Sequence, residues 1–163
     1  NNDDRYCAGD PNPDFYYGLN VKLSYKNWDF GFNGHGSIGY KVFNDFASNH
    51  STAYFDVNAG NLPNFATAVK RTGFTQISGD YQFFSDFYLE NASFFRMDDI
   101  NLGYTFKEIG NWQGNIRVAA SCQNVFVITN YSGIDPEINS TDGVDRTFWP
   151  RPRTFSVRLN VNF

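Results

Sequence analysis

The run of residues 34–39, GHGSIG, comes closest to a known ligand-binding motif. It matches the pattern G-x-G-x-x-G, which binds a dinucleotide when a helix follows and points its N-terminus at the pyrophosphate. Here the alternation of apolar and polar residues continues through Tyr40 and Val42, so no helix is expected to begin. Glycines in a strand more often permit bending or close packing, and we predict no bound cofactor.

Acidic residues offer two further candidate sites. Asp98 and Asp99 are adjacent, so in a strand they should point to opposite faces. They could not then converge on a substrate as the two carboxylates of a glycosidase do. A second acidic group lies in a predicted loop, where it could bind calcium, although its spacing matches no EF-hand. Its members are Asp135, Glu137, Asp142 and Asp145. We expect a solvated or salt-bridged loop there, and no catalytic set, so the protein is not expected to be an enzyme.

Histidine and cysteine residues are too scattered to suggest a metal site. His35 falls in a predicted strand and His50 in a predicted loop, and neither has a nearby cysteine or second histidine. Cys7 and Cys122 lie far apart in the sequence. Since Cys122 has the parity of an outward-facing strand residue, we do not expect a disulfide, and we predict no metal ligand.

The segments that position these residues alternate between apolar and polar side chains, as expected of β-strands with two different faces. Between residues 15 and 25, every odd position is apolar and most even positions are polar or small. Lys26 and Asn27 then form a tight turn, after which the alternation resumes. The five predicted strands are residues 15–25, 28–42, 94–106, 115–123 and 153–163.

Composition limits the kind of protein that these strands can build. The hydrophobic fraction is 41%, but mean hydropathy is −0.47, and no apolar run reaches the about 18 residues of a transmembrane helix. Aromatic residues make up 19% of the chain, which favours strands and membrane interfaces. The net charge of −4 argues against a nucleic-acid partner, because phosphates require a basic surface. A membrane protein of this composition would have to be a β-barrel.

The connections between the strands also indicate a transmembrane barrel. They alternate in length, since the first turn and residues 107–114 are short, whereas residues 43–93 and 124–152 are long. Aromatic residues gather at the strand ends beside the short connections, as in an aromatic girdle. They are Tyr25, Trp28, Phe106, Trp112 and Phe163. A soluble β-sandwich would also alternate, but its strands average about 5–6 residues, shorter than those predicted here.

About five strands cannot close a barrel, which needs about eight. Open sheet edges cannot face lipid, so the chain should be part of a larger antiparallel barrel. It could be a cleaved fragment, a C-terminal piece or a separate subunit.

Four segments of the chain carry a family resemblance. They are residues 10–18 (DPNPDFYYG), 93–104 (SFFRMDDINLGY), 123–137 (QNVFVITNYSGIDPE) and 151–155 (RPRTF). Together they resemble the C-terminal end of SusC/RagA-type TonB-dependent transporters of the Bacteroidetes outer membrane. The resemblance covers nearly the whole chain except residues 44–90.

This resemblance implies that the chain forms about five strands of a 22-stranded barrel that holds an N-terminal plug. It implies three partners besides lipid and the rest of the barrel: the plug, TonB and a SusD-like surface lipoprotein that acts as a lid. It also implies import of large nutrients, glycan oligosaccharides or peptides. The alternative is a SusC-like barrel with a structural or scaffold role in a larger outer-membrane complex.

The same topology assigns each segment to a side of the outer membrane. With a periplasmic C-terminus, the hairpins are residues 15–43 and 94–123, and the closing strand is 153–163. Residues 1–14, 44–93 and 124–152 would then be extracellular.

Three sets of residues are candidates for function. Exposed loop aromatics would contact the solute, or alternatively pack against another loop or the lid, namely Tyr81, Tyr131 and Trp149. Polar strand residues would line the lumen or touch the plug, namely Asn20, Lys22, Asn33, Arg117, Arg158 and Asn160. The closing strand would carry the membrane-assembly signal, as an alternating apolar series that ends in an aromatic residue. This series is Phe155, Val157, Leu159, Val161 and Phe163.

Overall fold

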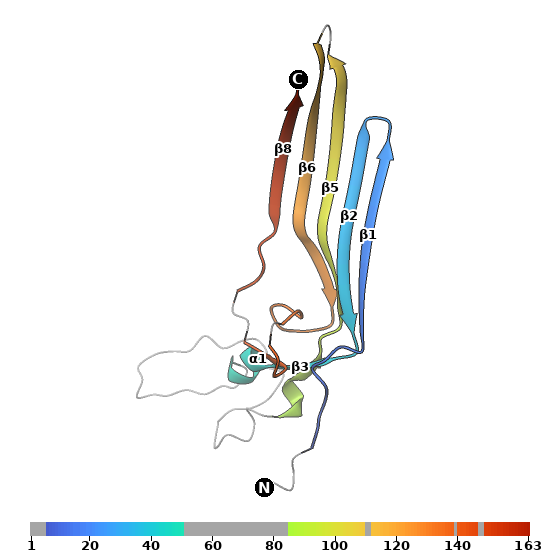
Figure 1. Ribbon diagram of the computed structural model, residues 1–163. Helices are drawn as coiled ribbons and strands as arrows, with labels where there is room; N and C mark the ends of the chain where they lie inside the picture. The colour runs from blue at the N-terminus through green and yellow to red at the C-terminus, as the bar shows by residue number, and fades with distance from the viewer. Residues whose placement is uncertain (1–5, 51–84, 110–111, 139, 147–148) are drawn as a thin grey trace, which may run out of the picture. The chain divides into compact units, whose positions relative to one another are not determined.

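The computed structural model describes residues 6–50, 85–109, 112–138, 140–146 and 149–163, which form two compact units (Figure 1). The strand unit comprises Phe15–Ile38, Phe94–Thr129 and Arg151–Phe163. The loop unit comprises Asn1–Asp14, Gly39–Ser93 and Asn130–Pro150. Each unit is described by itself.

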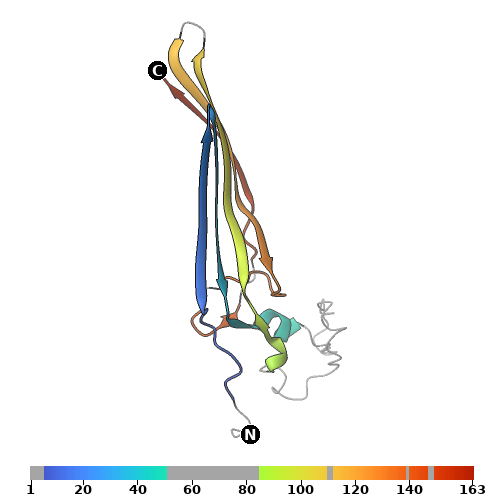
Figure 2. The same cartoon turned by 90° about the vertical axis from the view of Figure 1, so that its right-hand side faces the viewer.

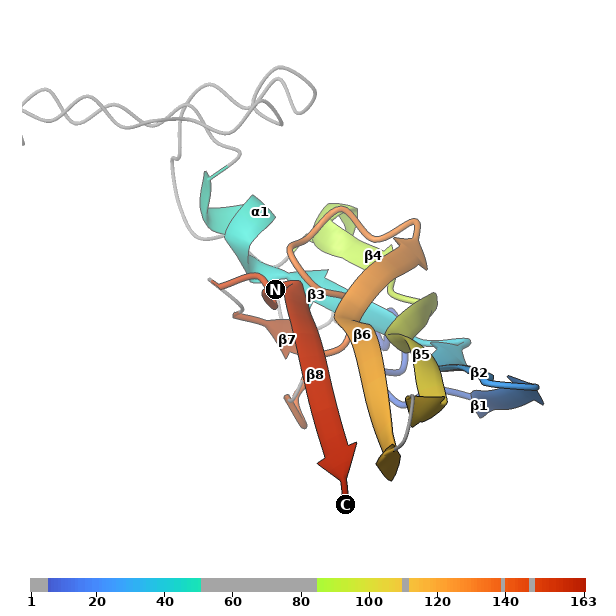
Figure 3. The ribbon, with the colours of Figure 1, turned by 90° about the horizontal axis from the view of Figure 1, so that it is seen from above.

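The strand unit is one five-stranded sheet in which all neighbours are antiparallel. In spatial order its strands are β1 (Phe15–Tyr25), β2 (Trp28–Ile38), β5 (Phe94–Ile109), β6 (Trp112–Thr129) and β8 (Thr154–Asn162). Figure 2 shows this sheet nearly edge-on as a single thin layer, and Figure 3 shows the strands following one another in the same order. We call the end with the β1–β2 turn the turn end, and the opposite end the loop end.

Alternation predicted the outer strands of this sheet well and the ends of the inner strands less well. β1 has the predicted bounds, and β8 differs by one residue at each end. β2 ends at Ile38 instead of residue 42, because Gly39 adopts a φ of 86°, a left-handed conformation that breaks the extended backbone. β6 continues to Thr129, six residues beyond its predicted end.

The extension of β6 passes through a β-bulge that sequence parity does not reveal. The β5–β6 register shifts between Met97 and Asp99, where Asn124 adopts a φ of 51°. The β2–β5 register shifts at the same level, between Asn33 and Gly34. β5 therefore has one extra residue at the bulge. On the turn side of the bulge the odd residues of β5 share a face with the odd residues of β2, whereas on the loop side the even residues of β5 do so.

The loop unit contains a small sheet of its own, whereas the sequence analysis predicted only loops there apart from residues 39–42, which it assigned to the end of the second strand. Its strands are β3 (Lys41–Asn44), β4 (Leu89–Asn91) and β7 (Val144–Asp145), and its helices are α1 (Asp45–His50) and η3 (Asp86–Tyr88). β3 lies in the middle, antiparallel to β4 and parallel to β7. The buried apolar side chains of the unit include Tyr40, Val42, Tyr88 and Tyr131. In the part of the chain that the structure describes, no helix has the length and apolar character needed to cross a membrane.

Candidate transport wall

The two faces of the five-stranded sheet differ in chemistry between the turn end and the bulge. Register places the even residues of β1 and β8 with the odd residues of the three inner strands, and this polar face is rich in amides and charges. Its main members are Asn20, Lys22, Asp29, Asn33, Asp99, Asn101, Arg117, Arg158 and Asn160. The opposite, apolar face carries Val21, Leu23, Phe30, Phe32, Ile100, Leu102, Val118, Ala120, Val157 and Leu159.

The polar residues predicted to line a lumen all lie on the polar face. Asn20 and Asn33 are direct register partners, and Asn33 is in turn the partner of Asp99. This row continues through Gln123 to Thr154, so one polar line crosses all five strands. The structure thus brings together residues that are more than a hundred positions apart in the sequence.

An ion pair on this face joins two strands that are not neighbours. Arg117 of β6 donates from Nε to Asp29 Oδ1 of β2 at 3.0 Å and from Nη2 to Oδ2 at 2.5 Å. The pair passes over Gly103 of β5, where an added Cβ would lie 2.5 Å from both side chains. Glycine is therefore needed at this position to let the two side chains meet. Sequence reasoning placed Arg117 on this face but did not find its partner.

A second pair lies at the bulge. His35 Nδ1 is 2.7 Å from Asp98 Oδ2, and the imidazole packs edge-on against Phe94 with ring centroids 5.5 Å apart. The neighbouring Asp99 accepts from Asn101 Nδ2 at 3.1 Å. His35 lies on the same face of β2 as Asn33, because the β1–β2 register is continuous there. Both carboxylates thus contact residues on the polar side of the sheet, which corrects the expectation that they point to opposite faces. The bulge is the physical reason, because the strict alternation of side chains fails there.

Asn124 fixes the bulge to the strands on both sides. Its Nδ2 donates to the carbonyl of Arg151 at 2.8 Å, and its Oδ1 accepts from Arg96 Nη1 at 2.8 Å. Its own carbonyl accepts from Arg153 Nε at 3.4 Å. One residue of β6 therefore bonds to β5 and to the segment that leads into β8.

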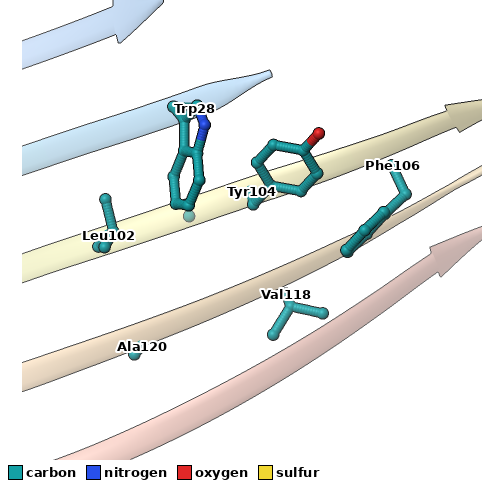
Figure 4. Close-up of a pocket in the computed structure, with 7 residues that line it drawn as sticks. Trp28, Leu102, Tyr104, Phe106, Val118 and Ala120 are labelled. Carbon is teal, nitrogen blue, oxygen red and sulfur yellow. The ribbon is translucent and has the colours of Figure 1, made fainter.

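Aromatic side chains form a cluster on the apolar face at the turn end (Figure 4). Tyr104 is the central ring, with centroids 4.7 Å from both Trp28 and Phe106 in edge-on geometry. Trp28 and Phe106 are two of the predicted girdle residues, whereas Tyr104 was not singled out. Beside these rings the smaller side chains of Val118 and Ala120 on β6 leave a groove of about 460 Å³.

A second aromatic row crosses the loop end of the sheet. Phe15 and Tyr17 of β1 are followed by Phe95 of β5 and Phe126 of β6, with successive ring centroids 6.2–6.3 Å apart. Phe95 and Tyr104 are nine residues apart on β5. At about 3.3 Å per residue and a tilt of about 40°, the two aromatic groups are separated by about 23 Å along a barrel axis. Transmembrane barrels have an apolar band of about this height, about 25 Å, between aromatic girdles.

The glycines of the G-x-G-x-x-G match form the floor beneath this row. Gly34 and Gly36 lie inside β2, and no helix begins at the motif. A Cβ at Gly36 would come within 2.4 Å of the Tyr17 ring and 2.3 Å of the Phe94 carbonyl oxygen. A Cβ at Gly34 would lie 3.0 Å from the Phe95 ring. The motif thus serves close packing of aromatic rings.

In the loop unit, Tyr131 differs from the exposed aromatic that the sequence analysis expected. Its side chain is 5% exposed and its hydroxyl donates to Asp145 Oδ2 at 2.6 Å. Burial, together with this carboxylate, raises the pKa of Tyr131 far above its ordinary value. Trp149 is 86% exposed, as expected, and Tyr81 lies outside the described residues.

The acidic loop contains internal pairs of the kind expected. Asp142 accepts from Ser140 Oγ, from Arg146 Nη1 at 2.9 Å and from the Val144 amide at 3.2 Å. These donors lower the pKa of Asp142 to about 2. Among the residues that the structure describes, no cluster of three or more acidic, histidine or cysteine side chains could hold a metal ion.

Known proteins of similar sequence are TonB-dependent receptors. No family model matches the chain. The TonB-dependent receptor SusC of Bacteroides thetaiotaomicron is 38% identical over 169 residues, which cover 98% of this chain and 16% of that receptor. The chain matches the C-terminal barrel portion of SusC/RagA-type TonB-dependent receptors. A second relative, TonB-dependent receptor P3 of Formosa agariphila, is 30% identical over 180 residues, 98% of this chain and 17% of that receptor.

Solved structures of lower sequence identity show the same fold for this chain. A structure of the RagAB peptide transporter aligns with a TM-score of 0.70 at 20% identity, covering 94% of this chain and 17% of that one. The RagAB peptide importer in its closed-closed state aligns with a TM-score of 0.69 at 18% identity, covering 94% and 18%. The segment is thus part of an antiparallel transmembrane β-barrel, and it spans about one-sixth of the relatives' length.

β8 presents residues 155–161 of the predicted apolar series on one face of the sheet. Phe155, Val157, Leu159 and Val161 are the register partners of Cys122, Ala120, Val118 and Ile116 on β6. The apolar residues of the two strands therefore continue one another across the sheet. Phe163 follows β8 directly and is fully exposed.

Proposed function

We propose that the full-length protein imports large nutrients, oligosaccharides or peptides, across the bacterial outer membrane as a SusC-like TonB-dependent transporter. The observation that carries this proposal is the 38% identity with a TonB-dependent receptor over 98% of the chain. The relatives are named as receptors, and the aligned structures as a peptide importer or transporter, which argues against an enzyme. The two faces of the sheet add a physical reason, since a transport barrel needs an apolar surface for lipid and a polar one for its lumen.

In the proposed orientation the turn end of the sheet and Phe163 are periplasmic, and the loop unit is extracellular. Short connections face the periplasm in barrels of this kind, and the β1–β2 connection consists of only Lys26 and Asn27. The polar face then lines the lumen or contacts the plug. Lys22 and Arg158 are exposed on that face, where they are available to a carboxylate of the plug.

The proposed partners are the remainder of the barrel, the plug, TonB and a SusD-like lipoprotein. The aligned structures of the RagAB peptide importer support a SusC-like subunit that pairs with a SusD-like lipoprotein. Within the loop unit, Trp149 is the best candidate for a contact with solute or lid, because its large ring is 86% exposed. Tyr131 is not proposed for such a contact, since its ring is buried.

Uptake by whole cells tests this function. Strains carrying the full-length gene, an in-frame deletion, or the gene without its TonB-binding segment would be offered labelled oligosaccharides and peptides with and without an uncoupler. We expect accumulation of one of these classes that requires the gene, the TonB-binding segment and the proton gradient.

Equal uptake of every solute by all three strains would contradict the transport proposal. If the deletion then altered the assembly of an outer-membrane complex, a scaffold role would replace it.

A further inference from the structure

The groove at the turn end is complete within the described sheet. Its walls come from β2, β5 and β6, which are the three inner strands, so the missing part of the barrel is not needed to form it. Trp28, Tyr104 and Phe106 line one side of the groove, and the smaller side chains of Val118 and Ala120 on β6 line the other (Figure 4). The groove exists because β6 carries small side chains where β5 carries aromatic rings.

The shape of the groove suits a single extended hydrocarbon chain. Along β5 the lining runs from Leu102 to Phe106, which is four residue steps, or about 14 Å at about 3.4 Å per residue. The lining is almost entirely aliphatic or aromatic carbon, which favours an apolar occupant.

A cation lies at the turn end of the same face. Lys26 Nζ is positioned over the Tyr25 ring, 5.3 Å from its centroid, and Tyr25 is the register partner of Trp28. The ammonium is therefore on the apolar side of the sheet. The Asn27 carbonyl accepts from the Thr105 amide at 2.9 Å, which fixes the turn beside the aromatic cluster on β5. Among the residues described, no carboxylate pairs with Lys26.

We infer that this groove binds one acyl chain of an anionic phospholipid, whose phosphate lies beside Lys26. An acyl chain would contact the apolar lining of the groove, and the positive charge of Lys26 would attract the phosphate. Aromatic rings such as those of Trp28 and Tyr104 are typical of the headgroup level of a membrane. The inference rests on the proposed membrane wall but not on the solute that the transporter carries.

Photo-crosslinking of the full-length transporter in nanodiscs tests the inference. The probes are phosphatidylglycerol and phosphatidylcholine with a diazirine near the middle of one acyl chain, and mass spectrometry locates the crosslinked residues. We expect crosslinks to the groove to exceed those to Leu159 of β8, and phosphatidylglycerol to exceed phosphatidylcholine in the groove.

Two pairs of variants sharpen the result. Ala120→Phe fills the groove and should lower crosslinking there about fivefold, the loss that corresponds to about 1 kcal/mol. Val157→Phe is the control, because Val157 is the exposed register partner of Ala120 on β8, and it should leave crosslinking in the groove unchanged. Lys26→Gln should lower the preference for phosphatidylglycerol about fivefold, as expected for one cation near a lipid surface. Lys22→Gln, on the polar face, should leave this preference unchanged.

Native folding of each variant would be checked by heat-modifiable migration on gels, with Ala120→Leu as the milder filling variant. Equal crosslinking of the groove and Leu159, or no effect of filling the groove, would overturn the lipid site and leave the membrane wall intact. Absence of lipid crosslinks at both positions would overturn the membrane wall as well.

Discussion

Gly103 is the residue on which the ion pair of the polar face depends. Asp29 and Arg117 reach each other across β5 only because no side chain stands between them. The pair is partly exposed, with 30% and 35% of the two side chains accessible, so its contribution to stability should be about 1 kcal/mol or less. The pair links β2 to β6 across the intervening β5 on the polar face.

Gly103→Ala should therefore separate the pair and lower the free energy of unfolding by about 1 kcal/mol. Urea unfolding of the full-length protein in lipid would measure the change. Gly18→Ala is the matched control, since a Cβ there has its nearest neighbour at 4.0 Å. Equal effects of the two substitutions would show that loss of glycine, and not loss of the pair, determines stability.

Asp142 gives the loop unit a response to acid. Its pKa is lowered to about 2, below the ordinary value of about 3.9. A lowered pKa means that the ionised group stabilises the loop above about pH 4, and that this contribution is lost as the pH falls through about 2.

Hydrogen exchange would report this response at the Val144 amide, which donates to Asp142. After correction for the intrinsic pH dependence, exchange should accelerate between about pH 4 and 2, and Asp142→Asn should abolish that step. An unchanged step in the variant would assign the acid response to another group.

At the scale of elements, the bulge in β5 and β6 has the largest effect on which side chains share a face of the sheet. Asn124 is held at a φ of 51°, which asparagine tolerates better than most residues, and its amide bonds both neighbouring segments. The conformation and the hydrogen bonds can be separated by substitution.

Asn124→Gly retains the left-handed conformation but loses the side-chain bonds, whereas Asn124→Ala loses both. The alanine variant should be less stable than the glycine variant by about 1–2 kcal/mol, measured by unfolding in lipid. If the two variants were equally stable, the backbone conformation would carry no cost and the hydrogen bonds alone would fix the bulge.

The same elements show how far sequence reasoning reaches. A period of two is a local property, so it predicted β1, β8 and the apolar series of the closing strand. A bulge depends on pairing with distant strands, which is why the predicted end of β6 and the predicted orientation of Asp98 were wrong. The Asp29–Arg117 pair was missed for the same reason, since its partners are 88 residues apart.

At the scale of the whole molecule, the chain combines the five-stranded sheet with a second, small folded unit. The loop unit has no sustained period, yet buried contacts such as Tyr131 with Asp145 give it a core. Sequence reasoning could not find this core, because its segments come from three separate parts of the chain. The prediction that Tyr131 is exposed was wrong because its ring belongs to this core.

The central claim is that one face of the sheet meets lipid and the other meets a polar interior. Spin labels placed singly at Val118, Ala119, Leu159 and Asn160 of the full-length protein test it directly. Val118 and Leu159 are register partners on the apolar face, and Asn160 and Ala119 belong to the polar face. We predict high accessibility to oxygen at Val118 and Leu159, and high accessibility to a water-soluble nickel complex at Ala119 and Asn160. Equal accessibility at all four positions, or the opposite phase, would contradict the membrane wall.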